Sequence, residues 1–126
     1  MTARTAQRLI AATFLILGGW CLLAPASIID LAFQPAFRSG TYLDRFLIAC
    51  FGAQACLAGL FAATARFSRT TFAAYGAALL PFFVFDWYFY AVVPLLTPLG
   101  LLDAVGNLAM LLLCVVGWRD SPAERP

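Results

Sequence analysis

Four long apolar stretches, separated by polar or charged segments, make up most of the chain. Each approaches the roughly 20 residues that cross the core of a bilayer as a helix. We therefore expect membrane spans at about residues 8–25, 42–65, 70–93 and 98–118. The pattern predicts an all-α fold, an integral membrane four-helix bundle that forms a single domain over residues 1–126. The polar tail, residues 119–126, is expected to be disordered.

The composition supports contact with lipid. Hydrophobic residues make up 63% of the chain and charged residues 11%, whereas soluble domains carry roughly 25% charged residues. A soluble protein of this size could not bury so much apolar surface, because small domains keep a high ratio of surface to volume. We therefore expect the lipid bilayer as a partner. A net charge of +2 is too small and too dispersed to favour nucleic-acid binding.

The first apolar stretch allows two interpretations. A basic start, an apolar run from Leu9 to Ala24 and the sequence Ala24-Pro25-Ala26 also fit a cleaved signal peptide. We expect a retained helix instead, because three further spans follow and the pair Gly18-Gly19 offers a surface for close helix packing.

The long connection at residues 25–41 and the start of the second span carry helix-capping patterns. Ser27 and Asp30 have the spacing of a capping box and are followed by apolar residues, which predicts a short amphipathic helix at the membrane surface. Thr41 and Asp44 repeat that spacing, so the second span is expected to begin at residue 42.

The remaining connections are short. The four residues 66–69 predict that the second and third spans pack as a tight antiparallel hairpin. Thr97 followed by Pro98 predicts the start of the fourth span, and Pro81 is expected to kink the third. Small residues along the second span predict a close approach between helices; they are Gly52, Cys56, Gly59 and Ala63.

The arginines predict the orientation. Six of the eight lie at the N-terminus, in the second connection and in the tail: Arg4, Arg8, Arg66, Arg69, Arg119 and Arg125. Positively charged loops stay in the cytoplasm. We therefore expect both termini to be cytoplasmic and the one long loop, between the first and second spans, to be outside.

Three polar residues are expected to meet inside the outer half of the membrane. Asp86 lies in the aromatic stretch at residues 81–90, about 12 Å inward from its end at 1.5 Å per residue. Asp103 and Asn107 share one face of the next span, roughly 8 and 13 Å inward. Ionisable residues at such depth mark functional sites by default. The candidate binding residues are Asp86, Asp103, Asn107, Arg45, Phe82, Phe83 and Tyr90.

A carboxylate inside hydrocarbon needs a partner or a proton. Arg45 is the one cation expected near that depth, so we expect an Arg45–Asp86 or Arg45–Asp103 ion pair. The alternative is that one of the two aspartates holds a proton.

Simpler explanations exist for the same residues. The aromatic side chains fit a membrane-interface belt, and Asp103 fits a favourable interaction with a helix N-terminus. Asn107 and Gln54 fit hydrogen bonds between helices.

Several kinds of chemistry are excluded because the chain contains no histidine or lysine. Histidine-ligated haem or zinc, histidine-activated nucleophiles and lysine Schiff bases cannot form. The four cysteines form no CxxC pair and lie in apolar runs, as expected of small buried hydrophobic residues. No cofactor and no metal site are expected.

The segments LGGW and LLAP in residues 17–25, and LLDAVGN at residues 101–107, occur in an architecture of four short spans with one long outer loop. This combination resembles the small DoxX-like membrane proteins of bacteria over most of the chain. The resemblance implies a multi-pass protein of the inner membrane and identifies no functional residue.

Three functions remain open. The first is a non-enzymatic module, either an accessory subunit or a binder of an apolar or amphipathic small molecule in a polar-aromatic pocket. The second is an oligomeric transporter that exchanges a proton on Asp86 for a small organic cation. The third is an enzyme that uses Asp86 and Asp103 as an acid–base pair. A homo-oligomer or a membrane-protein partner is compatible with the first two.

Overall fold

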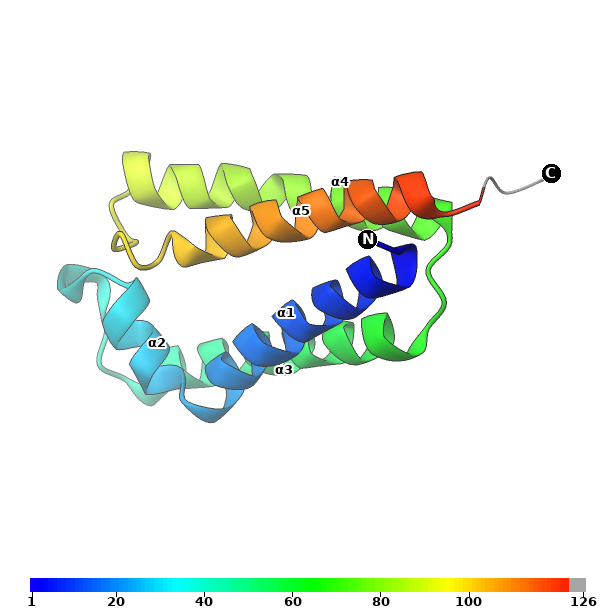
Figure 1. The fold of residues 1–126 in the computed structure, drawn as a ribbon. Helices are drawn as coiled ribbons and strands as arrows, with labels where there is room; N and C mark the ends of the chain where they lie inside the picture. Colours follow the sequence, from blue (N-terminus) through cyan, green and yellow to red (C-terminus); the bar gives the residue numbers. More distant parts are fainter. Residues whose placement is uncertain (123–126) are drawn as a thin grey trace.

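The computed structural model describes residues 1–122 and is entirely helical, which confirms the predicted all-α class (Figure 1). The elements are α1 (Ala3–Leu23), α2 (Pro25–Ala32), the 3-10 turn η1 (Pro35–Phe37), α3 (Tyr42–Thr64), α4 (Arg69–Trp87), the π-helical turn η2 (Tyr88–Val92) and α5 (Leu102–Asp120). Residues 123–126, part of the tail expected to be disordered, lie outside the described residues. Residues 119 and 120 of that tail belong to α5 instead.

Four of these helices are long and apolar enough to cross a membrane: Ala3–Leu23, Tyr42–Thr64, Arg69–Val92 and Leu102–Asp120. Large apolar side chains cover their outer faces. Phe61, Val84 and Val105, for example, are 62%, 65% and 62% exposed. Such exposure would destabilise a soluble protein and suits contact with lipid. The fold therefore indicates a multi-pass membrane protein.

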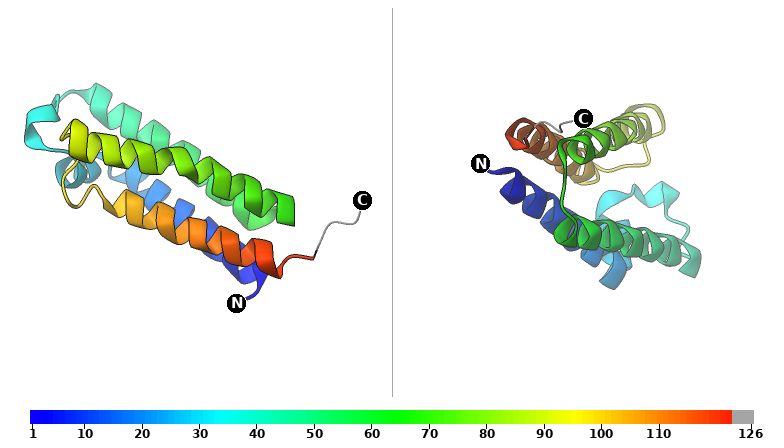
Figure 2. Two further views of the ribbon diagram at one scale, coloured as in Figure 1. Left: turned by 90° about the horizontal axis from the view of Figure 1, so that it is seen from above. Right: turned by 90° about the vertical axis from the view of Figure 1, so that its right-hand side faces the viewer.

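The four long helices form two pairs that meet along one seam. α1 packs along α3, α4 packs along α5, and α1 also packs against α5. Figure 2 shows the α1–α3 pair lying beside the α4–α5 pair. Within the described chain, α3 and α4 make no extensive contact. The predicted tight hairpin of the second and third spans is therefore wrong, and the bundle stays open on the side between α3 and α4.

The two ends of the bundle differ. At one end, here called the terminal end, the backbone N–H of Ala3 donates to Asp120 at 2.6 Å. The other, here called the loop end, holds α2 and the connection between α4 and α5 (Figure 1).

Glycine brings α1 and α3 together. A Cβ atom added to Gly52 would lie 2.6 Å from the carbonyl oxygen of Gly18, and one added to Gly18 would lie 2.8 Å from the Cβ of Ala55. One added to Gly59 would lie 3.0 Å from the Cβ of Phe14. Small residues let the backbones approach and gain dispersion contacts, which is the main source of helix association in lipid. The predicted close approach is confirmed at Gly52 and Gly59, whereas Gly19 has open space around it.

Buried Gln7 joins α1 to the end of α3. Its Nε2 donates to the carbonyl oxygens of Ala62 and Ala65, both at 2.7 Å, and its Oε1 accepts from the backbone N–H of Phe67 at 3.3 Å. The last carbonyl groups of a helix have no partner within the helix. Gln7 satisfies them and fixes where the chain leaves α3.

The aromatic ring of Phe67 packs on the first turns of α4. It packs on Phe72 and Tyr75 with ring centroids 5.2 and 5.0 Å away. Phe72 in turn fills the space beside Gly117 of α5, where a Cβ atom would clash with its ring. These contacts direct α4 toward α5, which explains why a short turn does not produce a packed hairpin.

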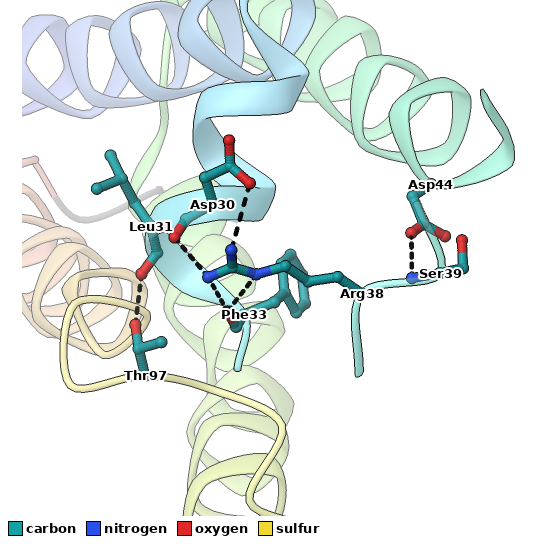
Figure 3. A network of polar contacts seen from close by, with 7 residues as sticks. All are labelled: Asp30, Leu31, Phe33, Arg38, Ser39, Asp44 and Thr97. Atoms are coloured by element: carbon teal, nitrogen blue, oxygen red, sulfur yellow. Dashed lines mark hydrogen bonds and ion pairs between the residues drawn. The ribbon is translucent and has the colours of Figure 1, made fainter. Parts of the chain in front are cut away.

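Backbone hydrogen bonds close the loop end. The N–H of Gln34 donates to Leu95, and the N–H of Thr97 donates to Ala32, both at 2.8 Å. The Thr97 hydroxyl also donates to the carbonyl oxygen of Leu31 (Figure 3). The α2 segment and the α4–α5 connection are thereby joined by a strap, defined as residues 31–34 and 95–97.

Two predicted helix starts are wrong. α2 begins at Pro25, and Ser27 donates to Ala24 while accepting from Trp20. The Thr97 hydroxyl accepts from the N–H of Gly100 at 3.1 Å, as a cap would, and also donates to Leu31 in the strap. Residues 98–101 nevertheless form a turn, and α5 begins at Leu102.

The start of α3 is as predicted, at Tyr42. Asp44, however, accepts from the N–H of Ser39 at 2.9 Å (Figure 3) and not from its predicted capping partner. α4 continues as a helix through Pro81, and the kink expected there stays a prediction.

We expect Gly52→Ala to destabilise the protein by about 1–3 kcal/mol, the usual cost of overpacking. Gly19→Ala, on the facing helix α1 but with open space at its Cβ, should leave stability unchanged or raise it. Thermal unfolding followed by circular dichroism in detergent measures both. Equal stability of the two variants would contradict the close glycine contact.

Gln7→Leu removes the donors that satisfy Ala62 and Ala65, so we expect a loss of about 1–3 kcal/mol per unsatisfied group. Gln54→Leu is the matched control, since Gln54 is exposed on α3. Comparison of their unfolding midpoints checks this, and a Gln7→Leu midpoint at the wild-type value would refute the role given to Gln7.

Candidate functional site

A cleft of about 760 Å³ lies on the open side of the bundle, between α3 and α4. α3 and α4 form its walls, and α1 and α5 form its floor. Its apolar lining comes from Phe14, Leu17, Gly18, Phe51, Ala55, Ala58, Ala74, Ala78, Leu79, Phe82 and Met110. This volume falls within the roughly 300–1,000 Å³ of small-molecule sites. Because the walls do not meet, the cleft is accessible sideways, from the position that lipid occupies.

Polar side chains line the cleft at three levels. Asp103 and Asn107 lie toward the loop end. Thr13, Gln54 and Tyr75 lie midway, and Ser68, Thr70 and Thr71 lie at the terminal end. A ligand in the cleft would therefore meet a mostly apolar surface with a carboxyl and an amide group at one end.

Asn107 connects the two acidic residues. Its Nδ2 donates to Asp103 Oδ2 at 2.9 Å, and its side chain also interacts with Asp86 on α4. Asp86 and Asp103 are close enough for their charges to interact. The predicted convergence of these three side chains is therefore present in the structure.

The two carboxyl groups have different surroundings. Asp86 is 7% exposed, and its Oδ2 is a buried atom with no hydrogen-bond partner among the described residues. Asp103 is exposed to the cleft. It also lies in the first turn of α5, nearer the loop end than expected, because α5 begins four residues later than the predicted start.

The expected ion pair of Arg45 is wrong. Arg45 is exposed near the start of α3, with its guanidinium 5.9 Å from the ring centroid of Tyr42. The ion pair found among the described residues joins Arg38 to Asp30 at 3.4 Å (Figure 3). Asp86 and Asp103 therefore have no arginine partner in the described chain.

The aromatic candidates separate into two groups. Phe82 lines the cleft. Phe83 is half-buried and Tyr90 is 41% exposed, and neither lines it. Trp87 and Tyr88, near the loop end, are 62% and 42% exposed, which suits the alternative of an interface belt.

Several cleft residues were not among the sequence-based candidates. Gln54 was expected to hydrogen-bond between helices, but it is exposed in the cleft and makes no side-chain hydrogen bond within residues 1–122. Its isolation as a strongly polar residue in an apolar span was the available signal. Thr13 and Tyr75 had no such signal, because a single hydroxyl in a membrane helix is common.

The helix changes character two residues after Asp86. The turn η2 is π-helical, and the N–H of Val93 donates to Tyr88 at 2.9 Å. Single π-turns within helices occur often at functional sites. Sequence patterns do not reveal them, since a π-turn depends on how the chain beyond it is held.

Within the described chain, no group of three His, Cys, Asp or Glu side chains is arranged to hold a metal ion.

Comparisons of the chain with protein-family models, with curated protein sequences and with solved structures found no match.

We expect Arg45→Ala to change the free energy of unfolding by less than about 0.5 kcal/mol, as is usual for surface positions. Arg38→Ala, on the same side of the bundle, removes hydrogen bonds to Phe33 and Asp30 and should cost about 1–3 kcal/mol. Unfolding midpoints in detergent test the pair. A larger decrease in the unfolding midpoint for Arg45→Ala than for Arg38→Ala would support the predicted buried ion pair of Arg45.

Proposed function

We propose that this chain is a small, non-enzymatic integral membrane protein that binds an apolar or amphipathic molecule in the cleft between α3 and α4. The observation that carries the proposal is the sideways opening of a mostly apolar cleft that has a carboxyl and an amide group at one end. A molecule dissolved in the bilayer could enter without crossing water, and its polar end would meet Asp103 and Asn107.

The proposal extends to location. The arginine distribution supports cytoplasmic termini, and the resemblance to small DoxX-like proteins supports the bacterial inner membrane. In that orientation the loop end faces outward, so Asp103 and Asn107 recognise the ligand near the outer surface. The same cleft would also serve an accessory subunit, which would present the bound molecule to a membrane-protein partner.

One observation favours a transporter as the second candidate function. Asp86 is buried with an unpartnered oxygen, and such a carboxyl group is suited to gain and lose a proton as a cation leaves and arrives. Transport by this route would need an oligomer, because the cleft of one copy is open along its side and does not enclose a pathway.

Photolabelling tests the binding proposal. The probe is a twelve-carbon alcohol that carries a photoactivatable diazirine, added to protein in nanodiscs of zwitterionic lipid. We expect labelled peptides from α3 and α4 at cleft positions. Ala78→Trp, which fills the cleft, should lower labelling about tenfold, a loss of about 1.4 kcal/mol in binding.

The matched control is Ala77→Trp. Ala77 is the neighbouring residue of α4, equally exposed, and it lies on a different face from the cleft. Its labelling should stay at the wild-type level. Labelling spread evenly over the lipid-facing surfaces, or the same loss in both variants, would count against the cleft as a binding site.

A further inference from the structure

Two interacting carboxyl groups near the loop end lack a positively charged partner in the described chain. The charged and titratable groups facing them from the packed helices are each other and Cys21 of α1, which interacts with Asp103 and with Cys56 of α3. The arginines of α1 and α4 lie at the terminal end, where Arg69 stacks on Trp118 at 3.9 Å. The loop end of the cleft therefore carries acidic side chains that no positively charged side chain of the described residues neutralises.

The helices give the two carboxyl groups different roles. Asp103 lies in the first turn of α5, where the positive end of the helix dipole stabilises a negative charge. It also accepts a hydrogen bond from Asn107 at 2.9 Å and is exposed to the cleft. The helix end and the hydrogen bond both stabilise a negative charge on Asp103, and its exposure to the cleft makes the carboxyl group accessible to a ligand.

Asp86 has the opposite surroundings. It lies inside a helix that continues through η2 to Val92, so no helix N-terminus faces it. Its Oδ2 is buried without a partner in the described chain, and a carboxylate oxygen left without a hydrogen bond in an apolar interior disfavours a negative charge. A second negative charge beside Asp103 would raise the cost further. These surroundings disfavour a second negative charge on Asp86 beside Asp103.

We infer that the molecule bound in the cleft is an amphipathic cation, with an ammonium group on Asp103 and a hydrocarbon body along the apolar walls. This inference rests on the proposed function of the cleft and adds the charge of its ligand. One ammonium group neutralises a negative charge on Asp103. The body extends from Asp103 toward the terminal end past Phe82, Leu17 and Ala78, which all line the cleft.

Asp86 acts as a positioning residue. Its side chain does not line the cleft, so it does not touch the ligand. It acts through Asn107, whose amide interacts with both carboxyl groups and so keeps Asp103 directed at the ligand.

Competition between three amphiphiles of equal chain length tests the charge of the ligand. Dodecylammonium, dodecanol and dodecanoate each compete with the diazirine alcohol in zwitterionic nanodiscs at neutral pH. For the wild type we expect dodecylammonium to compete at a concentration at least tenfold lower than dodecanol, and dodecanoate to compete least. In Asp103→Asn we expect dodecylammonium and dodecanol to compete with the diazirine alcohol at equal concentrations. For each amphiphile, the competing concentration in a variant is divided by that in the wild type. This ratio removes the differences in how the three amphiphiles partition into the bilayer.

A control variant completes the design. Asp44→Asn removes a half-buried carboxylate of α3 that does not line the cleft and should keep the wild-type preference. Circular dichroism and gel filtration confirm that each variant is folded.

The outcomes distinguish this inference from the function on which it rests. If all three amphiphiles compete equally in the wild type while labelling stays confined to the cleft, the inferred positive charge of the ligand is wrong and the proposed binding function is retained. A wild-type preference retained in Asp103→Asn overturns the role assigned to Asp103. Absence of cleft labelling in the wild type overturns the binding function itself.

Discussion

The close contact between α1 and α3 at Gly18 and Gly52 determines how the rest of the chain is arranged. Lipid gives helices no hydrophobic reason to associate, so the pair forms where glycine allows the backbones to meet. Gln7 fixes the end of α3, and Phe72 of α4 packs beside Gly117 of α5. α4 consequently packs on α5 and not on α3. The cleft is the result of this pairing, since two tight pairs joined along one seam leave one side open.

The strap at the loop end and the hydrogen bond between Ala3 and Asp120 at the terminal end hold the two pairs together without closing that side. The polar groups of the cleft are placed by the same framework. Asp103 is in the first turn of α5, and Asp86 lies near the junction of α4 and η2. Asn107 connects them, which places two carboxyl groups and an amide at one end of an apolar cleft.

The sequence was sufficient for the all-α class, the four long apolar helices, the glycines of α3 and the convergence of Asp86, Asp103 and Asn107. These features follow from composition and from helical periodicity, which are local. The pairing of helices was not predictable, because a short turn such as residues 66–69 allows either a packed hairpin or a separation. The predicted ion pair of Arg45 is wrong because the depth of a residue along a helix axis does not determine the direction in which its side chain points around that axis. Thr97 was assigned to a helix start, yet its hydroxyl bonds to Leu31, a contact that depends on a segment far away in the sequence.

The central claim is that one amphipathic cation occupies the cleft of each chain. Native mass spectrometry of protein released from nanodiscs made directly from its own membranes measures this, together with the oligomeric state. The account predicts one retained amine-bearing molecule per chain, absent from Ala78→Trp and present in Ala77→Trp. A spectrum in which the wild type carries only bulk phospholipid, in the same amount as Ala78→Trp, would contradict it.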